Sequence, residues 1–214
     1  MRLATTLALL VTSSTLASAN SIVATSDEPK VPNSWDGRLG LLLGGADVGD
    51  ASGFSVGVSG GLGYRMGDLT LRALADYYRV GDSNDAAVVR RGRATRLGGA
   101  MRYSFANMGD DTGIGVDFWG EAGLGYEHVA WLSGGVLDRP SGELAVGFEV
   151  DSRGERLPNG HRKHIGYFMD FRSLVGEGPE MSGPAICAGP CTQATKPSRT
   201  DVSMFFELGI HWGR

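Results

Sequence analysis

The sequence predicts an all-β protein, an eight-stranded antiparallel transmembrane β-barrel with long outer loops, and three observations favour it. Apolar and polar residues alternate with a period of two in eight segments, which is the pattern of strands with two different faces. The connections between the segments alternate in length, and the chain opens with an export signal. The alternation is clearest from Gly113 to Glu127, where Ile114, Val116 and Phe118 alternate with residues such as Asp117.

The export signal occupies residues 1–19. Arg2 supplies a positive charge, an apolar stretch follows, and Ala17-Ser18-Ala19 fits the small-x-small rule of signal peptidase. We expect cleavage after Ala19. A membrane anchor is the alternative, but the apolar core is shorter than the ~20 residues that a spanning helix needs. Residues 20–34 lack periodicity and predict a flexible periplasmic leader, so that the barrel domain covers residues 35–214.

The first four predicted strands are 35–44, 53–66, 68–79 and 93–106. On each, aliphatic and aromatic side chains alternate with glycine, serine, threonine, alanine or arginine. In chain order their apolar faces include Leu39, Leu41 and Leu43; Phe54, Val56 and Val58; Leu69, Leu71 and Ala73; and Leu97, Met101 and Tyr103.

The last four predicted strands are 113–127, 141–152, 163–175 and 201–212. The second faces of the first, second and fourth of these strands are rich in carboxylates rather than arginine, whereas the third carries His164, Asp170 and Arg172. In chain order their apolar faces include Ala122 and Leu124; Leu144, Val146 and Phe148; Ile165, Tyr167 and Phe171; and Val202, Met204 and Leu208. Across all eight strands, four residues break the alternation and suggest an imperfect register: Leu42, Leu74, Phe168 and Phe205.

The connections set the orientation of the barrel. The turn at residues 66–68 and the connection at 107–112 are short, whereas 80–92, 128–140 and 176–200 are long and rich in Gly, Pro, Ser and Asp. Outer-membrane barrels have short periplasmic turns and long outer loops, so the long connections are expected to face outward. The segment 152–162 departs from this trend, because it is long for a periplasmic turn.

The polar faces carry charges of opposite sign on different strands. An eight-stranded barrel is just wide enough to be filled by side chains, so these groups can meet across the lumen as the ion pairs that burial requires. Solvated charges on a soluble barrel such as a lipocalin are the alternative. The predicted lumen charge network consists of Arg38, Arg65, Arg72, Asp76, Arg96, Arg102, Asp117, Glu121, Glu143, Glu149, Asp170, Arg172 and Glu207. Within it, Glu121 and Glu149 are expected to need an arginine, with Arg72, Arg96 and Arg102 as candidates.

Aromatic residues on the apolar faces fall near the strand ends, as in the two aromatic girdles of a membrane barrel. The predicted girdle consists of Trp35, Phe54, Tyr64, Tyr77, Tyr103, Tyr126, Tyr167 and Trp212. The run 206–212, which alternates and closes on Trp212, resembles the C-terminal assembly signal of outer-membrane proteins. From Trp35 onward the chain therefore resembles the small outer-membrane barrels of the OmpA and OmpX type. It departs from them in that Gly213-Arg214 follows the terminal aromatic residue.

Three groups of residues have side chains that could carry chemistry. Cys187 and Cys191, in Cys-Ala-Gly-Pro-Cys, are expected to form a disulfide, since an exported protein meets oxidising conditions. The other two groups contain the four histidines of the chain, which we expect to be rim or girdle residues without a chemical role. A metal site at His161, His164 and His211, and a lipid-modifying site at His128 with Glu127 and Ser133, are the alternatives.

The composition limits the function. The net charge of −4 gives no case for a nucleic-acid partner. The glycine-rich segment 57–63 lies inside a strand with no helix after it, so it is not a dinucleotide loop. We expect no cofactor and no enzymatic activity. The expected function is a monomeric barrel at the surface of the bacterial outer membrane, structural or interactive through its loops. Its expected partners are membrane lipid, the barrel-assembly machinery through the last strand, and an unknown extracellular partner. A narrow pore or a small-molecule binder is the alternative.

Overall fold

The computed structural model describes residues 33–48, 51–80, 91–109, 113–132, 135–156, 162–178 and 199–213. The predicted signal peptide, nearly all of the predicted leader, and both cysteines lie outside these residues. No helix among the described residues is long and apolar enough to cross a membrane. The described elements are eight strands, namely β1 (Ser34–Val48), β2 (Ala51–Met66), β3 (Leu69–Val80), β4 (Gly92–Gly109), β5 (Ile114–Trp131), β6 (Val136–Arg156), β7 (Arg162–Gly178) and β8 (Arg199–Gly213).

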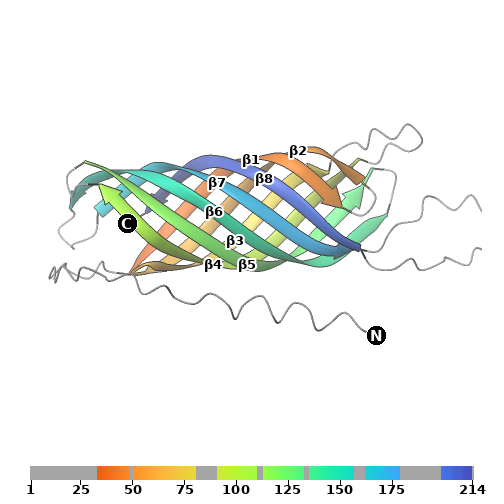
Figure 1. The fold of residues 1–214 in the computed structure, drawn as a ribbon, viewed down its shortest axis with the longest axis horizontal. Helices are drawn as coiled ribbons and strands as arrows, with labels where there is room; N and C mark the ends of the chain where they lie inside the picture. Colours follow the sequence, from red (N-terminus) through yellow and green to blue (C-terminus); the bar gives the residue numbers. More distant parts are fainter. Residues whose placement is uncertain are drawn as a thin grey trace, which may run out of the picture. The chain divides into compact units, whose positions relative to one another are not determined.

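The eight strands form one closed antiparallel barrel, which confirms the predicted fold class (Figure 1). Each strand pairs with the next along the chain, and β8 returns to pair with β1 through residues such as Gly40 and Gly209. Closure leaves no sheet edge unpaired. The first described strand begins and the last one ends at the same end of the barrel, here called the terminal end. The opposite end is called the loop end.

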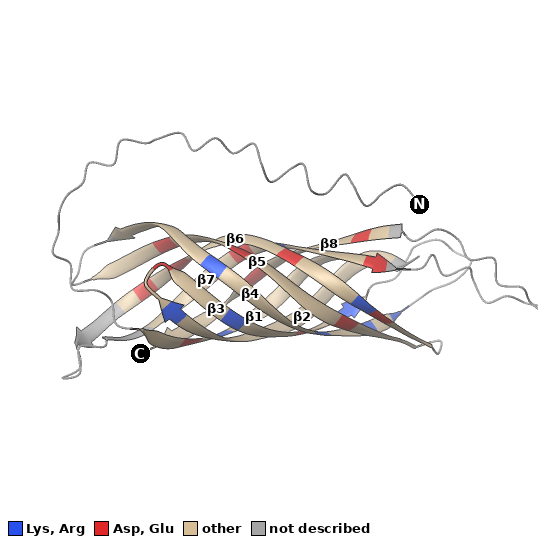
Figure 2. Ribbon diagram, turned by 90° about the horizontal axis from the view of Figure 1, so that it is seen from below, with Lys and Arg blue, Asp and Glu red and all other residues tan. Residues whose placement is uncertain are grey.

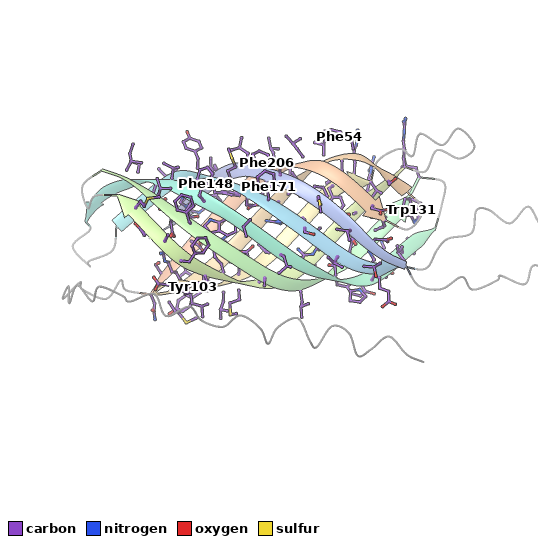
Figure 3. All side chains as sticks on the ribbon, in the orientation of Figure 1. Phe54, Tyr103, Trp131, Phe148, Phe171 and Phe206 are labelled. Atoms are coloured by element: carbon purple, nitrogen blue, oxygen red, sulfur yellow. The ribbon has the colours of Figure 1, made fainter. Side chains whose placement is uncertain are left out.

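The period-two alternation of the sequence becomes the difference between the inside and the outside of the barrel. In β3 every second residue from Thr70 to Val80 is buried, while those between them are exposed on the wall. Large apolar side chains cover the wall around the whole barrel (Figure 3). The polar faces of the strands therefore line the interior, the arrangement opposite to that of a soluble barrel.

The residues that seemed to break the alternation face the interior and keep the register. Leu42, Leu74, Phe168 and Phe205 are only 1%, 3%, 2% and 2% exposed. They occupy the same alternating, inward-facing positions of their strands as the buried charges. The expectation of an imperfect register at these residues was therefore wrong. Real irregularities occur elsewhere, between Ser104 and Ala106 and between Arg153 and Arg156.

Two predicted connections are largely strand. The predicted outer loop 128–140 is wrong, because β5 continues to Trp131 and β6 begins at Val136. Similarly, β6 continues to Arg156, so that 157–161 join it to β7. Gly, Pro and charged residues suggested loops, but in a closed barrel both neighbouring strands can continue the ladder and charged side chains can pair inside. Long connections at the loop end therefore join β3 to β4 and β7 to β8 only.

Candidate functional site

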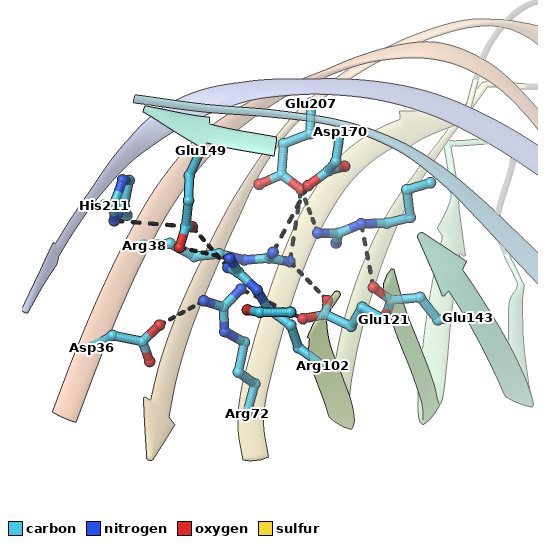
Figure 4. A network of polar contacts seen from close by, with 12 residues as sticks. Asp36, Arg38, Arg72, Arg102, Glu121, Glu143, Glu149, Asp170, Glu207 and His211 are labelled. Atoms are coloured by element: carbon cyan, nitrogen blue, oxygen red, sulfur yellow. Dashed lines mark hydrogen bonds and ion pairs between the residues drawn. The ribbon is translucent and has the colours of Figure 1, made fainter. Parts of the chain in front are cut away.

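The interior of the barrel is the candidate functional site because it concentrates buried charge. Six arginines and nine carboxylates are buried there. They come from every strand except β2, which contributes the buried hydroxyls of Ser55 and Ser59. A buried ion is costly unless it is paired and hydrogen-bonded. Figure 4 shows how part of this group meets across the lumen.

Two arginines hold the centre of the network. The Arg172 guanidinium lies 3.1 Å from Asp76 and 3.3 Å from Glu143, and it also donates a hydrogen bond to Glu207. The Arg96 guanidinium lies 3.0 Å from Asp76 and 2.6 Å from Glu143. The Arg172–Asp76 pair joins β7 to β3 and the Arg96–Glu143 pair joins β4 to β6, so these two pairs bridge strands that are not neighbours. Asp76 and Arg96 lie directly opposite each other in the β3–β4 ladder.

Toward the terminal end, the carboxylate of Glu121 lies between two arginines. It is 3.4 Å from Arg38 and 3.4 Å from Arg72. Arg72 also pairs with Asp36 at 2.5 Å. The Arg38 guanidinium lies over the ring of Phe168, 5.4 Å from its centroid. Each guanidinium of this group is thus held by more than one partner.

Arg102 forms a second group at the same end of the interior. Its guanidinium lies 2.6 Å from Glu149 and 3.6 Å from Asp117. It also lies 4.4 Å from the ring centroid of Trp119, whose side chain is fully buried. A guanidinium over an indole face is favourable, and more so away from water. The network therefore uses the aromatic ring as well as the carboxylates.

His211 belongs to this group, in the lumen rather than on the rim. Its Nε2 lies 2.9 Å from Asp151 and its Nδ1 lies 4.0 Å from Glu149, and the ligand atoms of the three residues lie within 4.8 Å of one another. Arg102 competes with any cation for Glu149, so the arrangement favours an ion-paired cluster. Of the other two histidines proposed for a metal site, His161 and the side chain of His164 lie outside what the structure describes.

Nearer the loop end, Arg139 joins Glu127 and Asp201. Its Nε donates a hydrogen bond of 2.5 Å to Glu127, and its Nη1 donates one to Asp201. The hydroxyl of buried Tyr78 donates to the other oxygen of Glu127. This group explains why β5 and β6 continue beyond the predicted strand ends, since Arg139 lies directly opposite Glu127 in the ladder.

An apolar cluster fills the interior toward the loop end. Tyr78 packs edge-on against Phe205, with ring centroids 4.9 Å apart. The cluster, here called the apolar plug, consists of Leu42, Ala46, Val48, Tyr78, Val80, Ala94, Val129, Trp131, Leu137, Leu174 and Phe205. Close-packed apolar side chains leave few voids as large as a water molecule. The described interior is thus filled mainly by charges around Arg172 and toward the terminal end, and by the apolar plug with the Arg139 group toward the loop end.

The structure buries twelve of the thirteen residues predicted for the lumen network. Arg65 is the exception, because its side chain is 25% exposed at the terminal end, 3.6 Å from Asp117. The predicted list also omits Asp36, Glu127, Arg139 and Asp201, which belong to the network. Extending the period of two would have found Asp36 and Asp201, whereas Arg139 was hidden in a predicted loop.

The wall has an apolar belt with aromatic residues at both ends. All eight predicted girdle residues face outward, and the rings of Trp35 and Tyr64 contact each other at a tilt of 59°, with centroids 5.1 Å apart. Where the structure describes wall side chains in the strands, the carboxylates, arginines and histidine lie within three residues of the loop end of their strand. These rim residues are Asp47, Arg79, Arg93, His128, Asp138 and Glu177. Figure 2 shows the charged positions along the ribbon.

The predicted grouping of His128 with Glu127 does not form. Glu127 points into the barrel, whereas His128 is on the wall, where its Nδ1 lies 2.7 Å from Asp138. Successive residues of a strand point to opposite sides, so neighbours in sequence cannot share a site here. Ser133 lies outside the described residues. The acid that accompanies His128 is therefore its cross-strand neighbour.

Comparison with known proteins gives structural neighbours but no family. No family model and no curated protein matches the chain. Neisserial surface protein A is similar in structure, with 16% identity and a TM-score of 0.47 over 83% of this chain and 95% of that one. Ail, the attachment invasion locus protein of Yersinia pestis, solved with the heparin analogue sucrose octasulfate, has 11% identity and a TM-score of 0.39 over 85% of this chain and 99% of that one. The fold assignment rests on the strand pairing of this chain itself.

Proposed function

We propose that this protein is a bacterial outer-membrane barrel with a closed lumen, which acts as a structural or surface-interaction protein through the connections at its loop end. The observation that carries the proposal is the inverted polarity of the barrel: the wall is apolar between its ends while the interior is charged. A membrane-spanning sheet must pair all of its backbone groups, which a closed barrel does. The predicted export signal supports the same location.

The exposed side chains on the wall match a lipid environment. Leu124, Val146 and Phe171 are 77%, 60% and 66% exposed, and similar residues surround the barrel. Soluble monomers rarely expose apolar patches beyond a few hundred Å². Aromatic rings at both ends of the belt suit the two membrane interfaces. Lipid is therefore the first partner that we propose.

The filled interior favours a structural or interactive role over that of a pore. Arg96 and Arg172 are fully buried among carboxylates, and Phe205 and its neighbours pack beside them. A conducting channel needs a continuous water path, whereas these side chains meet across the lumen. We infer that activity lies at the surface of the barrel, with no chemistry in the lumen, and that the last strand serves recognition by the assembly machinery.

Location and conductance provide the direct test. The protein should fractionate with the outer membrane, start at Asn20, and migrate differently in gels before and after heating. In planar bilayers it should show no stable single-channel steps. Recovery as a soluble periplasmic protein would refute the membrane placement, and reproducible conductance would support the narrow pore instead.

A substitution on the wall tests which face meets lipid. Val146→Arg places a charge in the middle of the apolar belt and should cost ~2–4 kcal/mol of unfolding free energy in lipid vesicles. The control is Ser59→Thr, a small change on the interior face of β2, which should cost less. Measured by urea unfolding, equal costs would show that the two faces have been assigned incorrectly.

A further inference from the structure

We propose that Arg79 and Arg93 form a binding site on the barrel wall for the phosphate group of an outer-leaflet lipid. The inference rests on the proposed placement in an outer membrane and names one specific partner there. Arg79 is the second-last residue of β3 and Arg93 is the second residue of β4. Both side chains are exposed on the wall.

The two arginines lie directly opposite each other in the antiparallel ladder between β3 and β4. The Cβ atoms of such a pair lie about 4.5–5.5 Å apart, and like charges placed there destabilise the sheet. Within the part of the chain that the structure describes, neither side chain forms an ion pair, in contrast to the six buried arginines. A bound anion between them would turn an unfavourable pair into a favourable one.

Their position along the barrel matches a lipid headgroup. Tyr77, a girdle residue 43% exposed, precedes Arg79 by two residues, which is about 7 Å along a strand. Leu97 lies further along the wall toward the terminal end and is 64% exposed. A lipid whose chains lie on the apolar belt would therefore bring its headgroup to the arginines. A soluble anion would have no such apolar surface to use.

The surrounding charges make this part of the rim distinct. Toward β6 the rim carries the His128–Asp138 pair, in which a carboxylate already has a partner. On β7 it carries Glu177, which is negative. The described rim therefore concentrates unpaired positive charge on β3 and β4. The planar guanidinium suits bidentate contact with phosphate oxygens, which favours phosphate as the ligand.

Native mass spectrometry of the full mature protein tests the site. The protein, in detergent, is offered an equimolar mixture of a bisphosphorylated lipid A and the same lipid without phosphates. The wild type should retain the phosphorylated lipid about tenfold in preference, because charge-assisted hydrogen bonds contribute at this level. The double variant Arg79→Gln/Arg93→Gln should lose that preference. Arg79→Lys/Arg93→Lys should keep part of the preference, since the positive charge remains while the planar guanidinium that makes bidentate contacts is lost.

Glu177→Gln is the matched control, because it changes a charge at the same end of the barrel away from the arginine pair, and it should leave the preference unchanged. Equal retention by the wild type and the glutamine variant would overturn the inference. Displacement by millimolar inorganic phosphate alone would also overturn it, since the site would then bind a free anion. A wild type that shows heat-modified mobility but no lipid preference refutes this inference only, whereas failure to insert into membranes refutes the proposed function.

Discussion

The interior of the barrel has two sections that close the same lumen by different means. Around Arg172 and toward the terminal end, arginines and carboxylates meet in the interior, and each arginine there has several partners. Toward the loop end, Leu42, Val129 and Phe205 pack with their neighbours in the apolar plug. The first section needs particular partners at particular positions. The second needs chiefly apolar volume, apart from the hydrogen bond that the Tyr78 hydroxyl donates to Glu127.

This difference teaches where the barrel tolerates change. Ion pairs are directional, and loss of one partner leaves the other buried and uncompensated. Apolar packing is non-directional, and its loss scales with the removed volume. Glycines contribute to the charged section by leaving space, since a Cβ at Gly63 would meet Asp36 at 1.8 Å. A single substitution in the charged section should therefore lower the unfolding free energy sharply, whereas in the apolar plug the loss should grow with the volume removed.

Removal of the central cation should have the largest effect. Arg172→Met leaves Asp76, Glu143 and Glu207 with one cation fewer and should cost ~3–5 kcal/mol in urea unfolding from vesicles. Arg172→Lys, which keeps the positive charge but loses the planar guanidinium, should cost less. A loss below ~1 kcal/mol for the methionine variant would mean that water screens these carboxylates and that the section is not dry.

A cavity in the apolar plug should have the next largest effect. Leu42→Ala removes a side chain that is 1% exposed and should cost ~2–5 kcal/mol, with little dependence on salt. The matched control is Leu41→Ala, one residue along the same strand but 55% exposed on the wall. Urea unfolding of both variants checks the difference. Equal losses would show that wall and plug contribute alike.

Neutralising Asp170 should have the smallest effect. Asp170 is buried directly opposite Glu207 in the ladder, and its ion pair with Arg38 is long, at 3.8 Å. Asp170→Asn should change the unfolding free energy by no more than ~1 kcal/mol, in the stabilising direction, because it removes a like-charge pair. Asp76→Asn is the contrast, since Asp76 lies 3.0 Å from Arg96.

That contrast should appear in the same unfolding experiment. Asp76→Asn weakens a carboxylate held by two arginines and should be clearly destabilising. Equal effects of the two substitutions would show that the carboxylates of the charged section are interchangeable, and that their individual positions do not matter.

The alternation of the sequence was sufficient to predict the fold and most of the interior. The predicted strands agree with β1 to β8 within a few residues at most ends, because a period of two is a local property of each strand. The ends of β5 and β6 were not predictable in this way. β5 and β6 continue where Arg139 forms ion pairs with Glu127 and Asp201, and Asp201 belongs to a strand distant in the sequence.

The sequence by itself determined which side chains face inward and that both signs of charge occur there. Only the tertiary structure decided which charges meet, since barrel closure and strand stagger set the heights at which residues of different strands face one another. Thus Glu121 lies between Arg38 and Arg72, while Glu149 pairs with Arg102. Closure also gathered the apolar interior residues into one plug, because their common height does not appear in any single strand.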